Sequence, residues 1–297
     1  MNFSNILVIK LGALGDFVQA TPAFEALRKR FPHACLTLLT TAPYREFGQK
    51  LGFFQKIMVD QRLKAHKVFD LFSFLRTLQR QQFDCVIDLQ NVDRTRLYSW
   101  FLKCPWYGPF YENAQHPQQR FTTFLKNMGI DHMPSLNLEK LGENFTGPIP
   151  RPYVLVVPGS SGAHDGAKCL SQENYAFLCQ KLLEKGIHSL IMGGKGQDFS
   201  KLQALCPEAI NLVGQTSFYH IISLAKHAVF AVGNDTGPML LAASGGCPTI
   251  TFYSDKNPPT IGGALGENHF SVHVSCLKSL GVQEMIQHVC KIPIWPL

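Results

Sequence analysis

The stretch 228–253 contains residues whose types and order could bind an anionic group. Residues 228–232 form an apolar run that predicts a buried parallel strand, and residues 234–237 form the polar turn Asn-Asp-Thr-Gly. Pro238 is typical of the first turn of a helix, and Gly245 of its end. A strand, a turn and a helix N-terminus would place backbone N–H groups at the carboxyl edge of a sheet, which suits a phosphate. A βαβ crossover that binds nothing, with a residue of the turn as helix cap, fits the same pattern.

The first glycine-bearing loop of the chain could position a general base. Residues 6–10 predict a buried strand, and residues 11–16 are expected to form a loop in which Gly12 and Gly15 allow a close approach of the backbone. Asp16 ends this loop, and its carboxylate could take a proton from a hydroxyl group. The same residue could instead serve as a cap of the following helix.

The cysteines predict neither a disulfide framework nor a metal site. The nine cysteines include no C-x-x-C pair, and His273 with Cys276 is the nearest approach to a pair of metal ligands. This pattern is typical of scattered, reduced thiols. We therefore expect no bound metal.

The composition indicates a globular protein of two domains. The chain has 297 residues, of which 45% are hydrophobic and 16% charged. The N-terminal apolar run is too short for a signal peptide and contains Lys10, and no run approaches the ~20 apolar residues of a membrane span. We therefore expect a cytoplasmic protein.

The net charge of +7 is concentrated in the first half of the chain. Residues 1–150 contain 18 Lys and Arg against 12 Asp and Glu. This excess indicates that the first half meets a polyanion or an anionic membrane surface, although a solvated surface without a partner has the same composition. The basic residues expected to form such a surface are Arg62, Lys64, Lys67, Arg94 and Arg96.

Predicted strands and helices alternate along the whole chain, which indicates α/β domains with parallel sheets. The alternation is interrupted by the Gly- and Pro-rich stretch 142–152, which is typical of a linker, and then restarts. We therefore predict two Rossmann-like domains, residues 1–148 and 149–280, that face each other across a cleft. Residues 281–297 should form a last helix, with the N-terminal domain as its expected packing partner.

Four segments of the chain resemble glycosyltransferase family 9, the lipopolysaccharide heptosyltransferase family with the GT-B fold. They are ILVIKLGALGDFVQATPAFEALRKRFP at the N-terminus, FDCVIDLQ, the PGSSG loop leading to Lys168, and GNDTGPMLLAASGGCPTITFY followed by PTIGGALG. The resemblance implies an inverting transfer of a sugar to a lipopolysaccharide core or related glycolipid. Similar enzymes move heptose from ADP-heptose at the cytoplasmic face of the inner membrane. The resemblance implies no cofactor and no nucleic-acid partner.

The resemblance also implies roles for individual residues. Asp16 matches the family's catalytic base, and Lys168 matches its lysine facing the donor diphosphate. No D-x-D motif is present, so lysine and helix-dipole charge are expected to take the place of a metal ion. The residues expected to bind the nucleotide sugar are Ser160, Ser161, Lys168, Asp198, Asp235, Thr236, Gly237 and Pro238. Those expected on the acceptor side are Gly15, Arg62, Lys64, Lys67, Arg94 and Arg96.

The chain departs from the family pattern at Leu240. The family usually reads D-[ST]-G-x-x-H, and leucine stands here at the histidine position. The segment FYSDKNPP also stands where a glycine-containing loop with Thr or Ser is usual. Three interpretations stay open: an active family 9 transferase, a degenerate member that binds nucleotide or glycolipid without turnover, and another GT-B enzyme such as a nucleotide-sugar epimerase.

Overall fold

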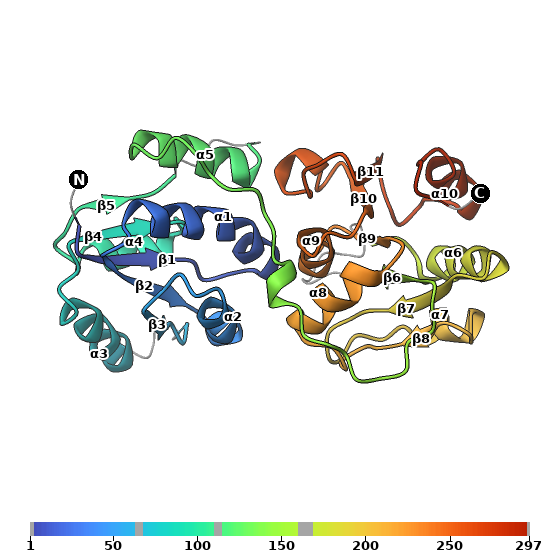
Figure 1. Cartoon of the computed structure of the whole chain (residues 1–297), viewed down its shortest axis with the longest axis horizontal. Helices are drawn as coiled ribbons and strands as arrows, with labels where there is room; N and C mark the ends of the chain where they lie inside the picture. Colours follow the sequence, from blue (N-terminus) through green and yellow to red (C-terminus); the bar gives the residue numbers. More distant parts are fainter. Residues whose placement is uncertain (1–2, 63–67, 110–114, 160–168, 296–297) are drawn as a thin grey trace. The chain divides into compact units, whose positions relative to one another are not determined.

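The computed structural model of the chain describes residues 3–62, 68–109, 115–159 and 169–295. The chain divides into two compact units, residues 1–136 and 137–297 (Figure 1). Each unit contains one parallel sheet and the helices that connect its strands. The predicted α/β class with two parallel sheets is confirmed.

The N-terminal unit is a five-stranded sheet with its connecting helices. Its strands are β1 (Asn5–Ile9), β2 (Cys35–Thr40), β3 (Lys56–Val59), β4 (Cys85–Asp88) and β5 (Trp106–Tyr107). Its helices are α1 (Leu14–Arg30), α2 (Arg45–Lys50), α3 (Val68–Gln79), α4 (Asp93–Ser99) and α5 (Pro117–Asn127), with a 3-10 turn η1 (Ala42–Tyr44). The strand order is β3-β2-β1-β4-β5, with every pair parallel. The connections leave β1 and β4 in opposite directions, so the loops after these two strands are the expected ligand loops of this unit.

Helix α1 begins earlier than the sequence predicted. It starts at Leu14, so Asp16 lies in its first turn and not at the end of a loop. Pro22 stands inside the helix and cannot donate a hydrogen bond to the Val18 carbonyl oxygen, four residues before it. The Thr21 hydroxyl donates to that oxygen at 2.7 Å. The helix therefore continues past the proline with this carbonyl satisfied.

The C-terminal unit is a six-stranded parallel sheet with the order β11-β10-β9-β6-β7-β8. Its strands are β6 (Tyr153–Val157), β7 (His188–Ile191), β8 (Ile210–Asn211), β9 (Ala231–Asn234), β10 (Thr249–Ser254) and β11 (His269–Val274). Its helices are α6 (Gln172–Glu184), α7 (Ser200–Leu205), α8 (Phe218–His227), α9 (Gly237–Ser244) and α10 (Val282–Val289), with 3-10 turns η2 (Glu139–Leu141) and η3 (Pro259–Ile261). Here the connections diverge between β6 and β9, so the loops after these two strands are the expected ligand loops.

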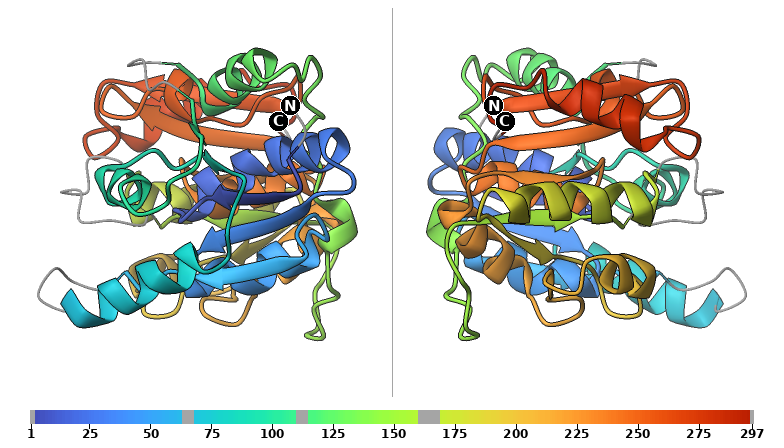
Figure 2. Two further views of the ribbon diagram at one scale, coloured as in Figure 1. Left: turned by 90° about the vertical axis from the view of Figure 1, so that its left-hand side faces the viewer. Right: turned by 90° about the vertical axis from the view of Figure 1, so that its right-hand side faces the viewer.

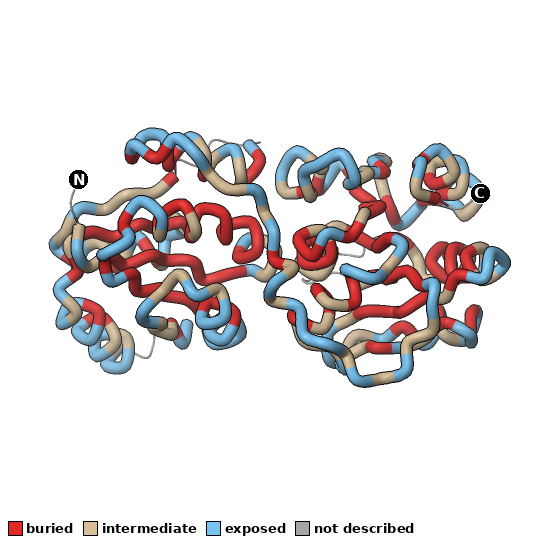
Figure 3. The backbone as a smooth tube through the Cα atoms, viewed as in Figure 1, coloured by how far each residue is buried: buried red, intermediate tan, exposed pale blue. Residues whose placement is uncertain are grey.

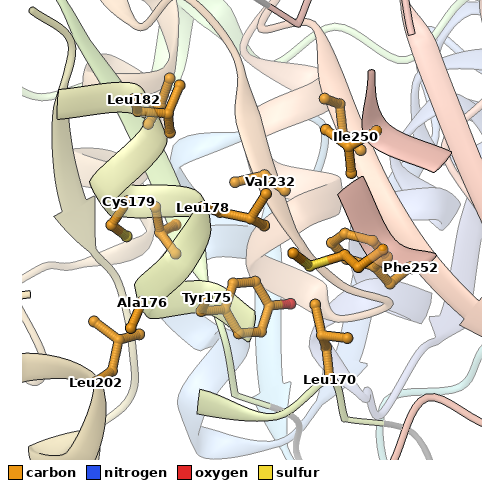
Figure 4. Close-up of a cluster of buried hydrophobic side chains, with 14 of the residues drawn as sticks. Leu170, Tyr175, Ala176, Leu178, Cys179, Leu182, Leu202, Val232, Ile250 and Phe252 are labelled. Atoms are coloured by element: carbon orange, nitrogen blue, oxygen red, sulfur yellow. The ribbon is translucent and has the colours of Figure 1, made fainter. Parts of the chain in front are cut away.

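The central strands of both sheets are almost wholly buried, whereas the edge strands are partly exposed (Figure 3). In the C-terminal unit, α6 packs on a sheet face formed by Val232, Ile250 and Phe252 (Figure 4). Tyr175 of α6 is fully buried in this cluster, and its ring meets that of Phe252 edge-on with centroids 6.2 Å apart. The Ser171 hydroxyl caps α6, accepting a hydrogen bond from the Asn174 amide at 3.2 Å.

The last helix packs on its own unit. Helix α10 contacts α6, and Met285 and Val289 are fully buried in the core of the C-terminal unit. The expected contact of residues 281–297 with the N-terminal domain stays a prediction. Trp295, after this helix, packs on Phe230 with ring centroids 5.9 Å apart. The apolar face of α10 therefore completes the core around α6.

Residues 137–148, which we assigned to the N-terminal domain, lie within the second compact unit. The Leu138 amide donates to the Ser244 carbonyl oxygen at 2.8 Å, and the Glu143 amide donates to the Tyr219 carbonyl oxygen at 3.1 Å. These hydrogen bonds tie the stretch to α9 and α8.

Helix α1 is 17 residues long and ends in the basic residues Arg28, Lys29 and Arg30. Within the described ranges, no helix combines the length and the apolar character needed to cross a bilayer.

Candidate functional site

The N-terminal unit gathers polar residues at the carboxyl ends of four neighbouring strands. They are Asp16 after β1, Tyr44 after β2, Arg62 after β3 and Asp88 at the end of β4. Two side chains tie these segments to the chain after β1: the Thr41 hydroxyl and the Arg62 guanidinium both donate to the Leu11 carbonyl oxygen, at 2.9 and 3.2 Å. The segments after β1, β2 and β3 are therefore joined at the carboxyl edge of the sheet.

Asp16 presents an exposed carboxylate at this edge. Its Oδ2 accepts one long hydrogen bond, from the Ala13 amide at 3.3 Å. The preceding loop packs closely, because a Cβ on Gly12 would lie 2.5 Å from the Tyr44 ring and the φ of Gly12 is +119°. Tyr44 in turn stacks on Phe17, with ring centroids 5.1 Å apart. The carboxylate thus lies in the first helical turn after a packed loop and is exposed to solvent, where a substrate hydroxyl could reach it.

Lys10 is a buried cation at the same edge, with 3% of the residue exposed. Its Nζ donates to the Leu89 carbonyl oxygen at 3.2 Å and lies 5.7 Å from the centroid of the Phe121 ring. Burial lowers the pKa of Lys10 to about 8; the charge of Asp16 acts to raise it, and that of Arg120 to lower it further. Lys10 could not be selected from the sequence, because nothing in the sequence distinguishes a buried lysine at the end of a strand from an exposed one.

Asp88 is less suited than Asp16 to act as a base. Only 1% of the residue is exposed, and its Oδ1 accepts hydrogen bonds from the Gln90 and Asn91 amides at 3.0 and 2.9 Å. Burial raises the pKa of Asp88 above its usual range. These contacts assign Asp88 to shaping the turn after β4.

Arg94, predicted on the acceptor surface, forms an ion pair with the buried Asp60. Its Nε and Nη2 donate to the two carboxylate oxygens at 2.8 and 2.7 Å, and the Tyr98 hydroxyl donates to Asp60 Oδ2 at 2.6 Å. Burial acts to raise the pKa of Asp60, but the hydrogen bonds from Arg94, Tyr98 and the Arg62 amide outweigh it and hold this pKa below its usual range. Bidentate pairing of this kind fixes the guanidinium in one orientation.

The other described basic residues of the predicted acceptor surface are exposed. Arg62 is fixed through its backbone amide, which donates to Asp60 Oδ1 at 2.7 Å, and its guanidinium reaches the loop before Asp16. Arg96 has a side chain 63% exposed and an ion pair of 3.6 Å with Asp93. Gly15 lies in the first turn of α1, next to Asp16.

In the C-terminal unit, Asn234 joins the loops after β6 and β9. It is fully buried; its Nδ2 donates to the Pro158 carbonyl oxygen at 2.7 Å, and its Oδ1 accepts from the Leu170 amide and the Tyr175 hydroxyl, both at 3.0 Å. Pro158 is the first residue of the PGSSG motif, and Leu170 follows Lys168 by two residues in the sequence. We did not select Asn234 from the sequence, because its partners lie at least 59 residues away along the chain.

Asp235 and Thr236 form the turn that leads into α9. Asp235 Oδ2 accepts from Asn257 Nδ2 at 3.3 Å, and Asn257 is held by the Ser254 hydroxyl at 2.8 Å. The divergent segment FYSDKNPP therefore supplies a partner for Asp235. Sequence reasoning did not select Asn257.

Thr236 is the N-cap of α9, without a hydrogen bond from its side chain to the helix. Its carbonyl oxygen accepts from the Met239 and Leu240 amides at 3.1 and 3.3 Å, and Pro238 has no N–H. The amides of Thr236 and Gly237 are therefore those of this terminus that could meet an anion. Leu240 is 6% exposed, so the position where the family has histidine is apolar here.

Asp198 is exposed and acts as a local cap, because its Oδ1 accepts from the Ser200 amide at 2.9 Å. Five predicted site residues lie outside the described residues: Ser160, Ser161, Lys168, Lys64 and Lys67. Among the residues that the structure describes, no three His, Cys, Asp or Glu side chains are grouped as metal ligands.

Each unit thus has one feature that is suited to a chemical role. The N-terminal unit has an exposed carboxylate near basic side chains, which could deprotonate a hydroxyl group. The C-terminal unit has a helix N-terminus beside the point where β6 and β9 diverge, which could bind an anion.

The chain is similar to known glycosyltransferases. The family described as glycosyltransferase family 9 (heptosyltransferase) matches residues 113–289. A Haemophilus influenzae protein described as a glycosyltransferase is 28% identical over 298 residues, which cover 84% of this chain and 82% of that protein.

Solved structures share the fold. The ADP-heptose lipopolysaccharide heptosyltransferase II of E. coli matches with a TM-score of 0.78 at 17% sequence identity. The match covers 97% of this chain and 98% of the E. coli chain. An E. coli heptosyltransferase solved with ADP matches with a TM-score of 0.74 at 18% sequence identity, and the match covers 97% of this chain and 99% of that one. The GT-B fold class is therefore confirmed. With a family match over more than half of its length, this chain belongs to glycosyltransferase family 9.

Proposed function

We propose that this protein is an inverting glycosyltransferase that moves heptose from ADP-heptose to a lipopolysaccharide core or related glycolipid. The observation that carries the proposal is the exposed Asp16 in the segment after β1, one of the two strands at which the direction of the connections changes. Asp16 takes the proton of an acceptor hydroxyl as that oxygen bonds to the anomeric carbon, and ADP leaves with the electron pair of the broken bond.

In this proposal the donor binds the C-terminal unit. The E. coli relative solved with ADP supports a nucleotide diphosphate donor. The Thr236 and Gly237 amides and the Lys168 side chain hold the diphosphate, with Ser160 and Ser161 on the same loop as Lys168. Asp198 is the weakest of the proposed donor contacts, because its carboxylate already accepts the Ser200 amide. No metal ion or cofactor takes part.

The acceptor is a phosphorylated glycolipid that meets the N-terminal unit. Arg62 and Arg96 are exposed, and Lys64 and Lys67 belong to the same basic stretch of sequence. Arg94 contributes indirectly, because it holds Asp60 and through it the Arg62 backbone. The enzyme works as a peripheral protein on the cytoplasmic face of the inner membrane.

The test is heptose transfer by Asp16→Asn, measured with radiolabelled donor. Asparagine keeps the shape of the side chain but cannot take the proton, so kcat should fall about 10²–10⁴-fold, with ADP affinity and melting temperature close to wild type. Asp93→Asn is the matched control, because Asp93 is fully exposed on another helix. Near-normal turnover by Asp16→Asn would make this residue a helix cap and end the proposal.

A second candidate, a family member that binds its ligands without turnover, is favoured by the buried Leu240. Leu240→His distinguishes the two. In a transferase slowed by the loss of this group, histidine raises turnover; in a binder, it does nothing or weakens binding, because it puts a polar group in an apolar pocket.

A further inference from the structure

The N-terminal unit exposes large aromatic side chains on α3 and just after α4. Phe69 is 92% exposed, Trp100 79% and Phe72 45%. The two helices meet here, because the Phe72 ring lies edge-on to that of Phe101, the neighbour of Trp100 in sequence, with centroids 6.2 Å apart. Aromatic groups gathered in this way on a soluble surface indicate an interaction site.

These aromatics are not a displaced part of the core. On the same helix, Leu75 and Leu78 are 3% and 0% exposed and belong to the cluster that packs on the sheet. Helix α3 lies at the outer edge of its unit in both Figure 1 and Figure 2. It therefore has one apolar face that packs on its own sheet and a second aromatic face open to solvent.

Basic residues are frequent in the stretch of sequence that carries the exposed aromatics. Residues 62–103 contain eight Lys and Arg against four Asp. The Arg76 guanidinium lies over the Phe72 ring, 4.7 Å from its centroid, and Arg80 and Lys103 are exposed nearby in sequence. On the acidic side, Asp70 is exposed on α3, so the excess of positive charge is partial.

We propose that this aromatic-basic face, formed by Phe69, Phe72, Trp100, Arg76, Arg80 and Lys103, docks on an anionic lipid bilayer. Trp and Phe insert at the level of the headgroups, and Lys and Arg meet the negative surface, which is the combination typical of interfacial anchors. The excess of positive charge complements anionic headgroups, whereas a second copy of the chain would bring the same positive charge to the interface. We therefore favour a bilayer as the partner. The proposal rests on the proposed function for its purpose: it brings the Asp16 unit to the membrane that carries the acceptor.

The test is flotation of the full chain with vesicles of phosphatidylglycerol and phosphatidylethanolamine that contain no glycolipid. The wild type should float, and Phe69→Ser with Trp100→Ser should lower the partition coefficient at least about tenfold, since two interfacial aromatics are lost. The matched control is Ile261→Ser with Leu265→Ser, since those side chains are 50% and 53% exposed in the other unit. The control variant should float like the wild type.

The charge contribution has its own measurement. Arg80→Gln with Lys103→Gln, higher salt, or vesicles of phosphatidylcholine alone should each weaken flotation several-fold, because exposed charges are screened by salt and need anionic headgroups. Equal flotation of the wild type and Phe69→Ser, Trp100→Ser variants would overturn the proposal. So would a dimer in sedimentation velocity that only the aromatic substitutions dissociate, with no flotation of the wild type.

The outcome is separable from the proposed transferase activity. With a water-soluble, deacylated acceptor, the aromatic variant should keep the wild-type kcat and KM, because neither residue is near Asp16 in sequence or bonded to its loop. Flotation without heptose transfer would support the docking face and count against the function; transfer without flotation would do the reverse.

Discussion

At the scale of single residues, two arginines predicted for the same role have different surroundings. Arg94 is bound to the buried carboxylate of Asp60, whereas Arg62 reaches the Asp16 loop with an exposed side chain. Arg94→Leu should destabilise the fold by about 3 kcal/mol, since it leaves a buried carboxylate without its charge partner. Arg62→Leu should cost under about 1 kcal/mol in stability and raise the acceptor KM. Urea unfolding and initial rates measure the two effects; a stable Arg94→Leu with a raised acceptor KM would contradict this division.

The buried Lys10 should leave a signature in the pH dependence of stability. Burial lowers its pKa in the folded state from 10.5 to about 8. Between these two pH values the unfolded chain binds more protons than the folded one, so the free energy of unfolding should rise with pH. The full contribution is roughly 3 kcal/mol. Lys10→Met should remove this rise in the free energy of unfolding, which chemical denaturation of both proteins at pH 8 and pH 10 measures. An equal change in the free energy of unfolding for variant and wild type would show that Lys10 is not a buried charge.

At the scale of secondary-structure elements, Asn234 should control how well the donor loop is formed. Asn234→Ala removes hydrogen bonds to Pro158, Leu170 and Tyr175, and it leaves buried polar groups unpaired. We expect a loss of stability of about 2–3 kcal/mol and ADP binding weakened by about tenfold. Tyr175→Phe is the matched control, because it removes one of these hydrogen bonds and leaves both loop ends tied. Isothermal titration of both variants with ADP decides; equal weakening would show that the effect is general destabilisation.

The elements that could be predicted are those with strong local patterns. The buried strands near the N-terminus and before the Asn-Asp-Thr-Gly turn follow from apolar runs of sequence. The start of α1 was placed too late, because residues 11–16 were assigned to a glycine-bearing loop, whereas the helix begins at Leu14. The partner of α10 could not be predicted, because an amphipathic pattern shows that a helix packs and not on what.

The candidate site shows the same division. Asp16 was selected because glycines and an acidic residue follow an apolar run, and Asp235 because it lies in a polar turn before a proline. The sequence analysis did not select Lys10, Asn234 or Asn257. Each of them is recognised only by its burial or by partners that are distant in sequence. The pairing of Arg94 with Asp60 has the same cause: 34 residues separate them.

At the scale of the whole molecule, we expect ADP to bind without added metal. The chain has no D-x-D motif, so the positive charge should come from Lys168 and the N-terminus of α9. A chelator should leave the affinity of the wild type unchanged, and Lys168→Ala should weaken it by about tenfold or more through loss of a charge-assisted contact. Lys185→Ala, past the end of α6, is the control. Binding that disappears with chelator would assign the diphosphate to a metal ion.

The packing of Trp295 on Phe230 has an optical consequence. The chain has three tryptophans: Trp100 and Trp106 belong to the N-terminal unit, and Trp295 is buried in the C-terminal unit. A chain with phenylalanine at positions 100 and 106 therefore emits from Trp295 alone. Its emission spectrum reports whether the C-terminal unit is folded, independently of the rest of the chain. The packed end of the polypeptide thus acts as an intrinsic fluorescent probe, through which nucleotide binding can be followed as protection of one unit against denaturant.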